Sequence, residues 1–253
     1  MRYTVAAETD IGIRKHTNED SVLVKRASYK KEEILMVVIC DGMGGLAKGE
    51  LASATVVREF NTWFEQVLPY EIAGITMQQI AEAWAQMLKK LNRKIGRFGQ
   101  QAHISLGTTC TAMLIYKDEY VIVHVGDTRC YYLGNRLKQM TTDQTFIARE
   151  ISRGTMTLEQ AKMDKRRNML LQCVGASSSI LPEILLGNVE SGAYLLCSDG
   201  FRHQISEKEI YDSLNPMNLF NKEAMHSNLQ YLINTVKERQ ERDNISAVLV
   251  KVE

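Results

Sequence analysis

Residues 34–44 read Ile-Leu-Met-Val-Val-Ile-Cys-Asp-Gly-Met-Gly, an apolar run that ends in an acid and a glycine-rich turn. An unbroken apolar run rich in β-branched residues is typical of a strand that is buried on both faces. Asp41 therefore stands where a buried strand leaves its sheet. The same pattern, a strand with an acid at its end, recurs along the chain.

Five predicted strands carry an acid at one end: Asp41 after 34–39, Asp127 after 119–125, Asp199 after 193–197, Asp243 before 245–252, and Glu19-Asp20 before 21–24. Each Asp-Gly pair alone is typical of a turn. Antiparallel neighbours, however, place the end of one strand beside the start of the next, so these acids can converge on one edge. Converging carboxylates repel unless they are protonated or neutralised by cations, and an oxygen-only set favours Mg²⁺ or Mn²⁺ over zinc. The residues thus indicate metal-assisted hydrolysis of a phosphate ester.

The remaining pattern predicts blocks of strands and helices. Further strands are expected at 3–7, 109–116, 128–133, 136–138 and 183–189. Apolar residues at helical spacing predict helices through 56–67, 80–95 and 225–236. Residues 141–181 show short helices, with a capping box from Thr157 to Gln160. No linker or repeat divides the chain, so we expect one α+β domain of sheets covered by helices.

Composition narrows the class of protein. The 253 residues are 45% apolar and 24% charged, which is ordinary for a globular domain, and the net charge of +1 argues against a nucleic-acid-binding protein. No apolar stretch is long enough for a membrane helix or a signal peptide, so we expect a soluble, cytoplasmic protein. The five cysteines lack metal-ligand spacing and are expected to be core residues.

Six short motifs follow one another along the chain: Asn18-Glu19-Asp20-Ser21, Asp41-Gly42-Met43-Gly44-Gly45, Gly107-Thr108-Thr109, Val125-Gly126-Asp127-Thr128-Arg129, Cys197-Ser198-Asp199-Gly200 and Asp243-Asn244. Their order and spacing, from about residue 3 to 252, resemble the metal-dependent (PPM, type 2C) protein serine/threonine phosphatases, and the glycine motif is similar to the bacterial branch. The resemblance implies an α-β-β-α sandwich of two antiparallel sheets flanked by helices. It also implies one phosphatase domain over 1–253, with a flap subdomain at about 143–181.

The resemblance further implies a binuclear Mn²⁺ or Mg²⁺ centre between the sheets. Asp41 would bridge the two ions, the carbonyl of Gly42 would bind one of them, and Asp199 and Asp243 would complete the ligands of the other. A water activated by the ions would attack phosphorus directly, so no covalent phosphoenzyme is expected.

The same resemblance implies supporting roles for other residues. Asp20 and, less directly, Glu19 would hold metal-bound waters, and Asp127 with Asp199 would bind a weaker third metal. Asn244 would orient Asp243 as a supporting partner.

The sequence departs from the family pattern at three places. The arginine that grips the substrate phosphate in the family corresponds to Lys15, with Arg14 one residue earlier; Lys cannot make the bidentate contact of Arg. Either Lys15 binds phosphate or a local shift brings Arg14 round, and we favour Lys15. Met43 replaces a histidine of eukaryotic members and cannot donate a proton, and Asp143-Gln144 replaces an Asp-His pair.

The flap carries a basic run, Lys162, Lys165, Arg166 and Arg167. This run either contacts the phosphoprotein or is a solvated helix end. Asp164 beside it is a further candidate for the third metal.

We therefore expect hydrolysis of phosphoserine and phosphothreonine in proteins, opposing a bacterial Ser/Thr kinase. The expected partners are phosphoprotein substrates and that cognate kinase, without nucleic acid or membrane, and the expected state is a monomer. The alternative is a catalytically weak or silent phosphoprotein-binding module on the same fold, favoured by Lys15 and Gln144 but not by the retained aspartates. A two-metal nuclease has little support from the charge.

Overall fold

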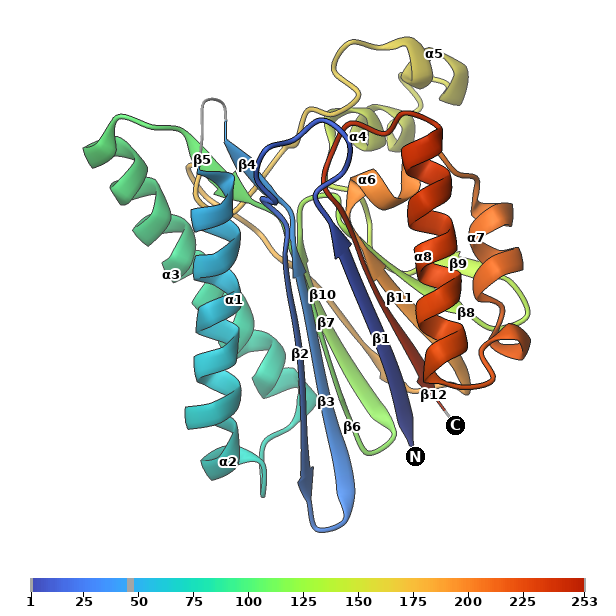
Figure 1. Ribbon diagram of the computed structural model, residues 1–253. Helices are drawn as coiled ribbons and strands as arrows, with labels where there is room; N and C mark the ends of the chain where they lie inside the picture. The colour runs from blue at the N-terminus through green and yellow to red at the C-terminus, as the bar shows by residue number, and fades with distance from the viewer. Residues whose placement is uncertain (1, 45–47, 253) are drawn as a thin grey trace.

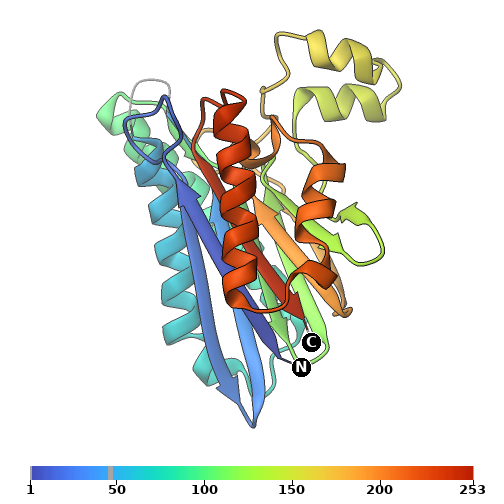
Figure 2. The same ribbon diagram turned by 45° about the vertical axis from the view of Figure 1, so that its right-hand side comes forward.

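The computed structural model describes residues 2–44 and 48–252, so Gly45 of the glycine motif lies outside the described residues. Two five-stranded antiparallel sheets pack face to face, with helices on both outer faces (Figures 1 and 2). The predicted α-β-β-α sandwich is therefore confirmed.

Each sheet is assembled from distant parts of the chain. The first runs in the order β1 (Tyr3–Asp10), β12 (Ile245–Val252), β11 (Gly192–Cys197), β8 (Arg129–Leu133) and β9 (Leu137–Gln139). The second runs in the order β10 (Glu183–Asn188), β7 (Glu119–Val125), β6 (Cys110–Tyr116), β3 (Glu32–Cys40) and β2 (Ser21–Tyr29). A separate pair, β4 (Gly42–Gly44) and β5 (Leu106–Thr108), extends from the upper edge of the second sheet.

Helices cover the outer faces. The second sheet is covered by α1 (Gly49–Gln66), α2 (Leu68–Glu71) and α3 (Met77–Ala102). The first sheet is covered by α6 (Asp199–Arg202), α7 (Glu207–Leu214), the 3₁₀ turn η1 (Pro216–Asn218) and α8 (Lys222–Glu238). The short helices α4 (Phe146–Ser152) and α5 (Leu158–Met163) stand apart above the sandwich (Figure 2).

Strand β3 shows why its sequence is apolar without interruption. Leu35, Val37 and Ile39 face the other sheet, in one core cluster with residues of β11 and β12. The alternate side chains of β3 face the helices, in the cluster that holds Phe60 and Trp84, whose rings meet edge to face with centroids 4.9 Å apart. Both faces of β3 are thus buried, which fixes its place in the middle of the molecule.

The structure adds elements to those predicted. Strand β4 and its partner β5 were not expected, because three residues rich in glycine carry no strand periodicity. Helices α6 and α7 also lie between β11 and α8, where no helix was expected. The capping box of Thr157 and Gln160 is confirmed, and all five cysteines are free and buried as predicted. In the described part of the chain, no helix is both long and apolar enough to cross a membrane.

Candidate metal centre

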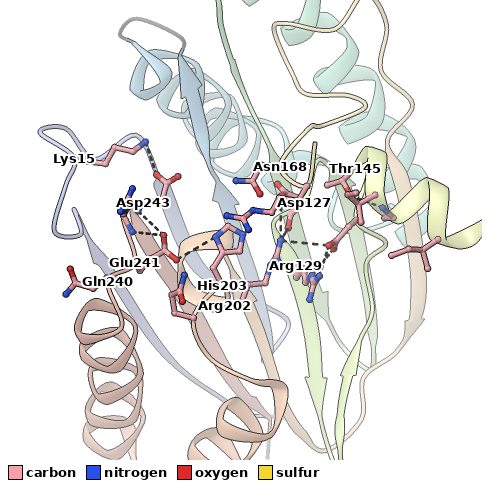
Figure 3. Close-up of a pocket in the computed structure, with 17 residues that line it drawn as sticks. Lys15, Asp127, Arg129, Thr145, Asn168, Arg202, His203, Gln240, Glu241 and Asp243 are labelled. Atoms are coloured by element: carbon pink, nitrogen blue, oxygen red, sulfur yellow. Dashed lines mark hydrogen bonds and ion pairs between the residues drawn. The ribbon is translucent and has the colours of Figure 1, made fainter. Parts of the chain in front are cut away.

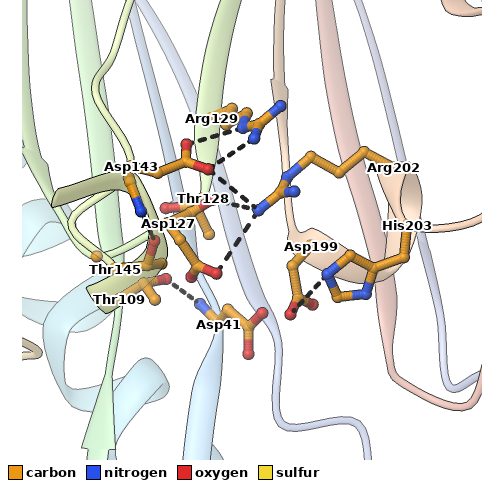
Figure 4. Close-up of polar contacts among 12 residues, drawn as sticks. Asp41, Thr109, Asp127, Thr128, Arg129, Asp143, Thr145, Asp199, Arg202 and His203 are labelled. Carbon is orange, nitrogen blue, oxygen red and sulfur yellow. Dashed lines mark hydrogen bonds and ion pairs between the residues drawn. The ribbon is translucent and has the colours of Figure 1, made fainter. Parts of the chain in front are cut away.

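The strand register brings the predicted acids to one edge of the sandwich. Ser21 pairs with Cys40, so the start of β2, with Asp20, lies beside the end of β3, with Asp41. Cys197 pairs with Ala247, which brings the end of β11 near the start of β12, and so Asp199 near Asp243. Figure 4 shows Asp41, Asp127 and Asp199 gathered at this edge.

Asp41 is held by its main chain and leaves its carboxylate free. Its N–H donates to Thr109 Oγ1 at 2.9 Å, and its carbonyl accepts from the N–H of Thr109 at 2.9 Å and from Thr108 Oγ1 at 3.0 Å. The next residue must be glycine, because a Cβ on Gly42 would lie 2.5 Å from the carbonyl oxygens of both Glu19 and Gly49. Burial and the neighbouring carboxylates raise the pKa of Asp41 well above its usual range.

Asp20, which is buried, and Asp199, which is half-buried, carry buried carboxylate oxygens without partners among the described residues. Neither oxygen of Asp20 has a hydrogen bond within the described chain, and the nearby hydroxyls of Ser198 and Ser246 do not reach bonding geometry on it. Burial raises the pKa of Asp20 to about 7, although those two hydroxyls oppose the change. The Oδ1 of Asp199 also lacks a described partner, and its Oδ2 lies 3.5 Å from His203 Nε2.

Asp243 and Glu19 share one cation. Lys15 Nζ lies 2.8 Å from Asp243 Oδ1 and 3.2 Å from Glu19 Oε2. Burial acts to lower the pKa of Lys15, but its bonds to Asp243 and Glu19 outweigh this and raise it. Arg14, in contrast, is exposed and makes no ion pair or hydrogen bond with any described residue. Of the two candidates, Lys15 is therefore the one that faces the carboxylates.

Asn244 organises the loop that carries Lys15. Its side-chain oxygen accepts from the N–H of Glu19 at 2.9 Å, and its Nδ2 donates to the carbonyls of Ile11 and Thr17. Its main-chain N–H donates to Asp243 Oδ1 at 2.9 Å. Asn244 thus contacts Asp243 through its main chain, while its side chain fastens residues 11–19 to the edge.

Asp127 adjoins a layer of ion pairs that the sequence did not predict. Arg202 Nη2 donates to the Asp127 carbonyl at 3.0 Å and lies 3.6 Å from its Oδ2. Arg129 makes a two-pronged contact with Asp143, at 2.8 and 2.6 Å (Figure 4). Burial and the charge of Asp199 raise the pKa of Asp127 to about 7, with Arg202 opposing. Burial of Asp143 is outweighed by Arg129, which holds the pKa of Asp143 below its usual value.

Gln144, which stands where the family has histidine, anchors the turn of Asp127. Its side-chain oxygen accepts from the N–H of Gly126 at 2.8 Å, and its own N–H donates to the Gly126 carbonyl at 2.8 Å. The carboxylate of Asp143 is bound by Arg129. Neither Asp143 nor Gln144 therefore presents an unbonded group to the carboxylate cluster, which consists of Asp20, Asp41, Asp127, Asp199 and Asp243. Gln144 fixes the position of Asp127 from outside.

The flap residues divide into two groups. Asp164 pairs with Arg166 on the flap itself, at 2.7 Å, and Arg166 stacks on the ring of Phe146. Arg167 lines the cavity described below, and Lys165 is exposed; the side chain of Lys162 lies outside the description.

A cavity of about 940 Å³ opens over the edge (Figure 3). Asp127, Asp243 and Lys15 line it, together with Ile147 and Ile151 of α4. Asp127 and Asp243 thus meet the cavity directly, whereas Asp20, Asp41 and Asp199 are not among its lining residues. Its volume is in the range of cavities that hold small ligands.

The donor set fits divalent cations. As they stand, no three His, Cys, Asp or Glu side chains within 2–44 and 48–252 are arranged to hold a metal ion. Nevertheless, buried carboxylate oxygens on Asp20 and Asp199 lack partners, and Asp41 lies in the field of four other aspartates. Oxygen atoms of this kind, left unpaired in a protein interior, are the ligands that Mg²⁺ and Mn²⁺ prefer.

Four residues of the site were not assigned a role from the sequence: Arg129, Arg202, His203 and Glu241. Arg129 lies in a motif and Arg202 follows Asp199 by three residues, or one helical turn, which was a usable signal. The contact of His203 with Glu241, at 3.7 Å, joins distant segments and has no signal in the sequence.

Comparison with known proteins gives one consistent result. The model of the protein phosphatase 2C family matches residues 13–250. Protein phosphatase PhpP of Streptococcus pneumoniae is 31% identical over 210 residues, which are 81% of either chain. The S. agalactiae serine/threonine phosphatase superposes with a TM-score of 0.87 at 25% identity, over 100% of both chains. The catalytic domain of the phosphatase PstP, solved with 2 manganese ions, gives 0.78 at 25% identity, over 98% of this chain and 97% of that one. The chain therefore belongs to the protein phosphatase 2C family and is a protein phosphatase.

Proposed function

We propose that this phosphatase hydrolyses phosphoserine and phosphothreonine in proteins at a centre of two Mn²⁺ or Mg²⁺ ions, and that it opposes a Ser/Thr kinase. The observation that carries the proposal is the set of unpartnered buried carboxylate oxygens on Asp20 and Asp199, at the strand edge from which Asp127 and Asp243 line the cavity. The serine/threonine phosphatase that superposes on the chain supports the substrate class. The proposal includes a cytoplasmic monomer.

Each acid has a role in holding the ions. Asp41, the main-chain carbonyl of Gly42, Asp199 and Asp243 would together hold the two ions. When bound, the ions activate water and neutralise the charge that develops on the phosphoryl group.

Three further residues would act from the periphery. Asp20 and Glu19 would act through water. Asp127 would share a weaker third ion with Asp199.

Lys15 would bind the substrate phosphate. Lys15 lines the cavity, and its ammonium group contacts Asp243 and Glu19. A phosphate oxygen that enters the cavity can therefore accept a hydrogen bond from the same ammonium group. The raised pKa of Lys15 keeps it charged at neutral pH. As a point charge it would orient the phosphate less firmly than an arginine.

The segment 143–181 would act as a flap within a single phosphatase domain. Helix α4 presents Ile147 and Ile151 to the cavity, and Arg167 lines the cavity beyond it. An apolar wall with a nearby cation suits the residues that flank a phosphorylated side chain. The flap would thereby hold the peptide and limit the access of water.

Hydrolysis of a phosphothreonine peptide tests the proposal. The wild-type chain should release phosphate with Mn²⁺ and not after chelation, and Asp199→Ala should lose this release. Asp118→Ala, which changes an exposed aspartate in the β6–β7 turn, serves as the matched control. Absence of release by well-folded protein at every Mn²⁺ or Mg²⁺ level would overturn the proposal in favour of a silent binding module.

A further inference from the structure

The C-terminal half of α3 carries a basic surface far from any acid in sequence. Five basic residues fall within positions 89–97: Lys89, Lys90, Arg93, Lys94 and Arg97. The last four are exposed, and none of the five makes an ion pair or a side-chain hydrogen bond with any described residue. We call these five residues the α3 basic face.

Some exposed cations elsewhere in the chain pair with acids, although others, such as Arg14, pair with none of the described acids. Lys208 pairs with Asp212, and Arg239 pairs with Glu209. The α3 basic face lacks partners because residues 83–117 contain no Asp or Glu. Like charges four residues apart, such as Lys90 and Lys94, destabilise a helix by a few tenths of a kcal/mol per pair. The net charge of the chain is only +1, so this is a local concentration of positive charge.

The face borders two hollows. One, of about 800 Å³, lies between α3 and residues 175–178 and is lined by Arg93, Arg97, His103 and Ser177. The other, of about 450 Å³, is lined by Lys90, Lys94 and Phe98 together with both arginines. Arg93 and Arg97 therefore line both hollows and can contact a ligand in either of them.

The larger hollow is fixed by buried contacts. Asn92 is buried; its Nδ2 donates to the Ser177 carbonyl at 2.9 Å, and its Oδ1 accepts from the N–H of Gly175 at 2.7 Å. A Cβ on Gly96 would lie 3.0 Å from the Gly175 carbonyl, so glycine permits this close approach. The hollow is preformed, which lowers the entropic cost of binding.

The face and the metal centre lie at the same end of the molecule. Helix α3 leads into β5, which pairs with β4 through Gly42 and Thr108, next to Asp41. Residues 175–178 belong to the last part of the segment 143–181. In Figure 1 the C-terminal end of α3 lies at the upper left and is joined to β5 by a short loop, while the flap stands at the upper right of the same end. A protein whose phosphorylated residue occupies the cavity would reach the α3 basic face by extending across this end of the molecule.

We propose that the α3 basic face is a docking site for an acidic segment of the protein substrates, an inference that rests on the proposed function. The five charges span about 12 Å of helix, which an extended peptide covers in about four residues. The hydroxyl and main-chain groups of a concave surface suit an extended polypeptide. A basic helix face also attracts an anionic membrane or a nucleic acid through charge alone. The preformed hollow beside Arg93 and Arg97, fixed by the contacts of Asn92 with residues 175 and 177, favours an extended polypeptide over either of them.

Kinetics with tailed peptides test the docking site. A phosphothreonine peptide is compared with the same peptide joined, through Gly-Ser linkers of several lengths, to six Asp and Glu residues. The variant is Lys90→Gln/Arg93→Gln/Lys94→Gln. The matched control is Lys31→Gln/Lys138→Gln/Lys222→Gln, three exposed lysines with the same total change of charge. We expect the tail to lower KM by about fivefold in the wild type and the control but not in the α3 variant. The tailless peptide should be hydrolysed equally by all three proteins.

A binding measurement keeps the test independent of activity. Fluorescence anisotropy of the labelled acidic tail, without phosphothreonine, should show binding to the wild type and the control and at least fivefold weaker binding to the α3 variant, even if no peptide is hydrolysed. Equal binding by all three proteins would overturn the proposal. So would binding to phosphatidylserine vesicles or single-stranded RNA that depends on the α3 residues and exceeds binding to the acidic tail, because the partner would then be a membrane or a nucleic acid.

Discussion

Two adjoining groups of aspartates show how the same residue type serves stability in one place and chemistry in the other. Asp143 lies in an ion-pair layer, bound in two places by Arg129, and its pKa is lowered. Asp20 lies in the carboxylate cluster without a partner among the described residues, and burial raises its pKa to about 7. Both are largely withdrawn from water. The difference lies in the partner: Asp143 has its cation within the protein, whereas the carboxylate cluster around Asp20 needs one.

The ion-pair layer should produce the largest loss of stability when it is broken. Arg129→Ala leaves the Asp143 carboxylate largely buried without its main partner, at an expected cost of about 3 kcal/mol in the free energy of unfolding. Urea unfolding of metal-free protein measures this cost, with the exposed Arg136→Ala as control. A loss equal to that of the control would show that the layer does not stabilise the fold.

The carboxylate cluster should respond in the opposite direction. Asp20→Asn removes a buried charge, so we expect metal-free protein to become more stable at neutral pH. Because the folded-state pKa of Asp20 lies above the unfolded value, wild-type stability should fall as pH rises from about 4 to about 7. The gain from Asp20→Asn should therefore be small near pH 4 and reach on the order of 1–3 kcal/mol above pH 7.

Thermal unfolding of the metal-free proteins across this pH range measures the gain. Saturating Mn²⁺ should reverse the order of the two proteins, because the wild type gains a ligand that the variant binds less well. If Asp20→Asn destabilises the metal-free protein at pH 8, the buried charge of Asp20 is not the unfavourable feature that we infer.

Lys15 contacts both Asp243 and Glu19. Its substitution tests whether a charge at this edge binds substrate, in contrast to the charges of Arg129 and Asp143, which serve stability. Lys15→Gln should raise KM for a phosphopeptide about tenfold, because it removes a charge-assisted contact to phosphate. Lys15→Arg should retain binding, and Arg14→Gln should leave KM unchanged. A large effect of Arg14→Gln with none from Lys15→Gln would assign phosphate binding to Arg14 instead.

Gln144 should have the smallest effect. Gln144→Ala leaves the N–H of Gly126 without its side-chain acceptor, at a cost of about 1 kcal/mol in unfolding free energy. Denaturant unfolding of the variant measures it. Gln144→Glu, which keeps the acceptor, should recover part of the loss; equal losses in both variants would assign the effect to packing rather than to this hydrogen bond.

The sequence allowed much of this arrangement to be predicted because local patterns carry it. The acids lie at strand ends, and antiparallel pairing then brings them to one edge; β12 begins and ends at the predicted residues. The ion-pair layer could not be predicted in this way, because Arg202 meets Asp127 across 75 residues of chain. The strand β4 was missed because Gly42 serves close approach to the carbonyl of Glu19, which no periodicity reveals.

The most direct test of the central claim is calorimetric titration of metal-stripped protein with Mn²⁺. The wild type and Asp118→Asn should bind at least two ions, and Asp41→Asn should lose them, with affinity reduced by more than about 100-fold, since even supporting residues of metal sites cost 10–100-fold. Equal Mn²⁺ binding by Asp41→Asn and the wild type, or none by the wild type, would contradict the assignment of the carboxylate cluster as the metal centre.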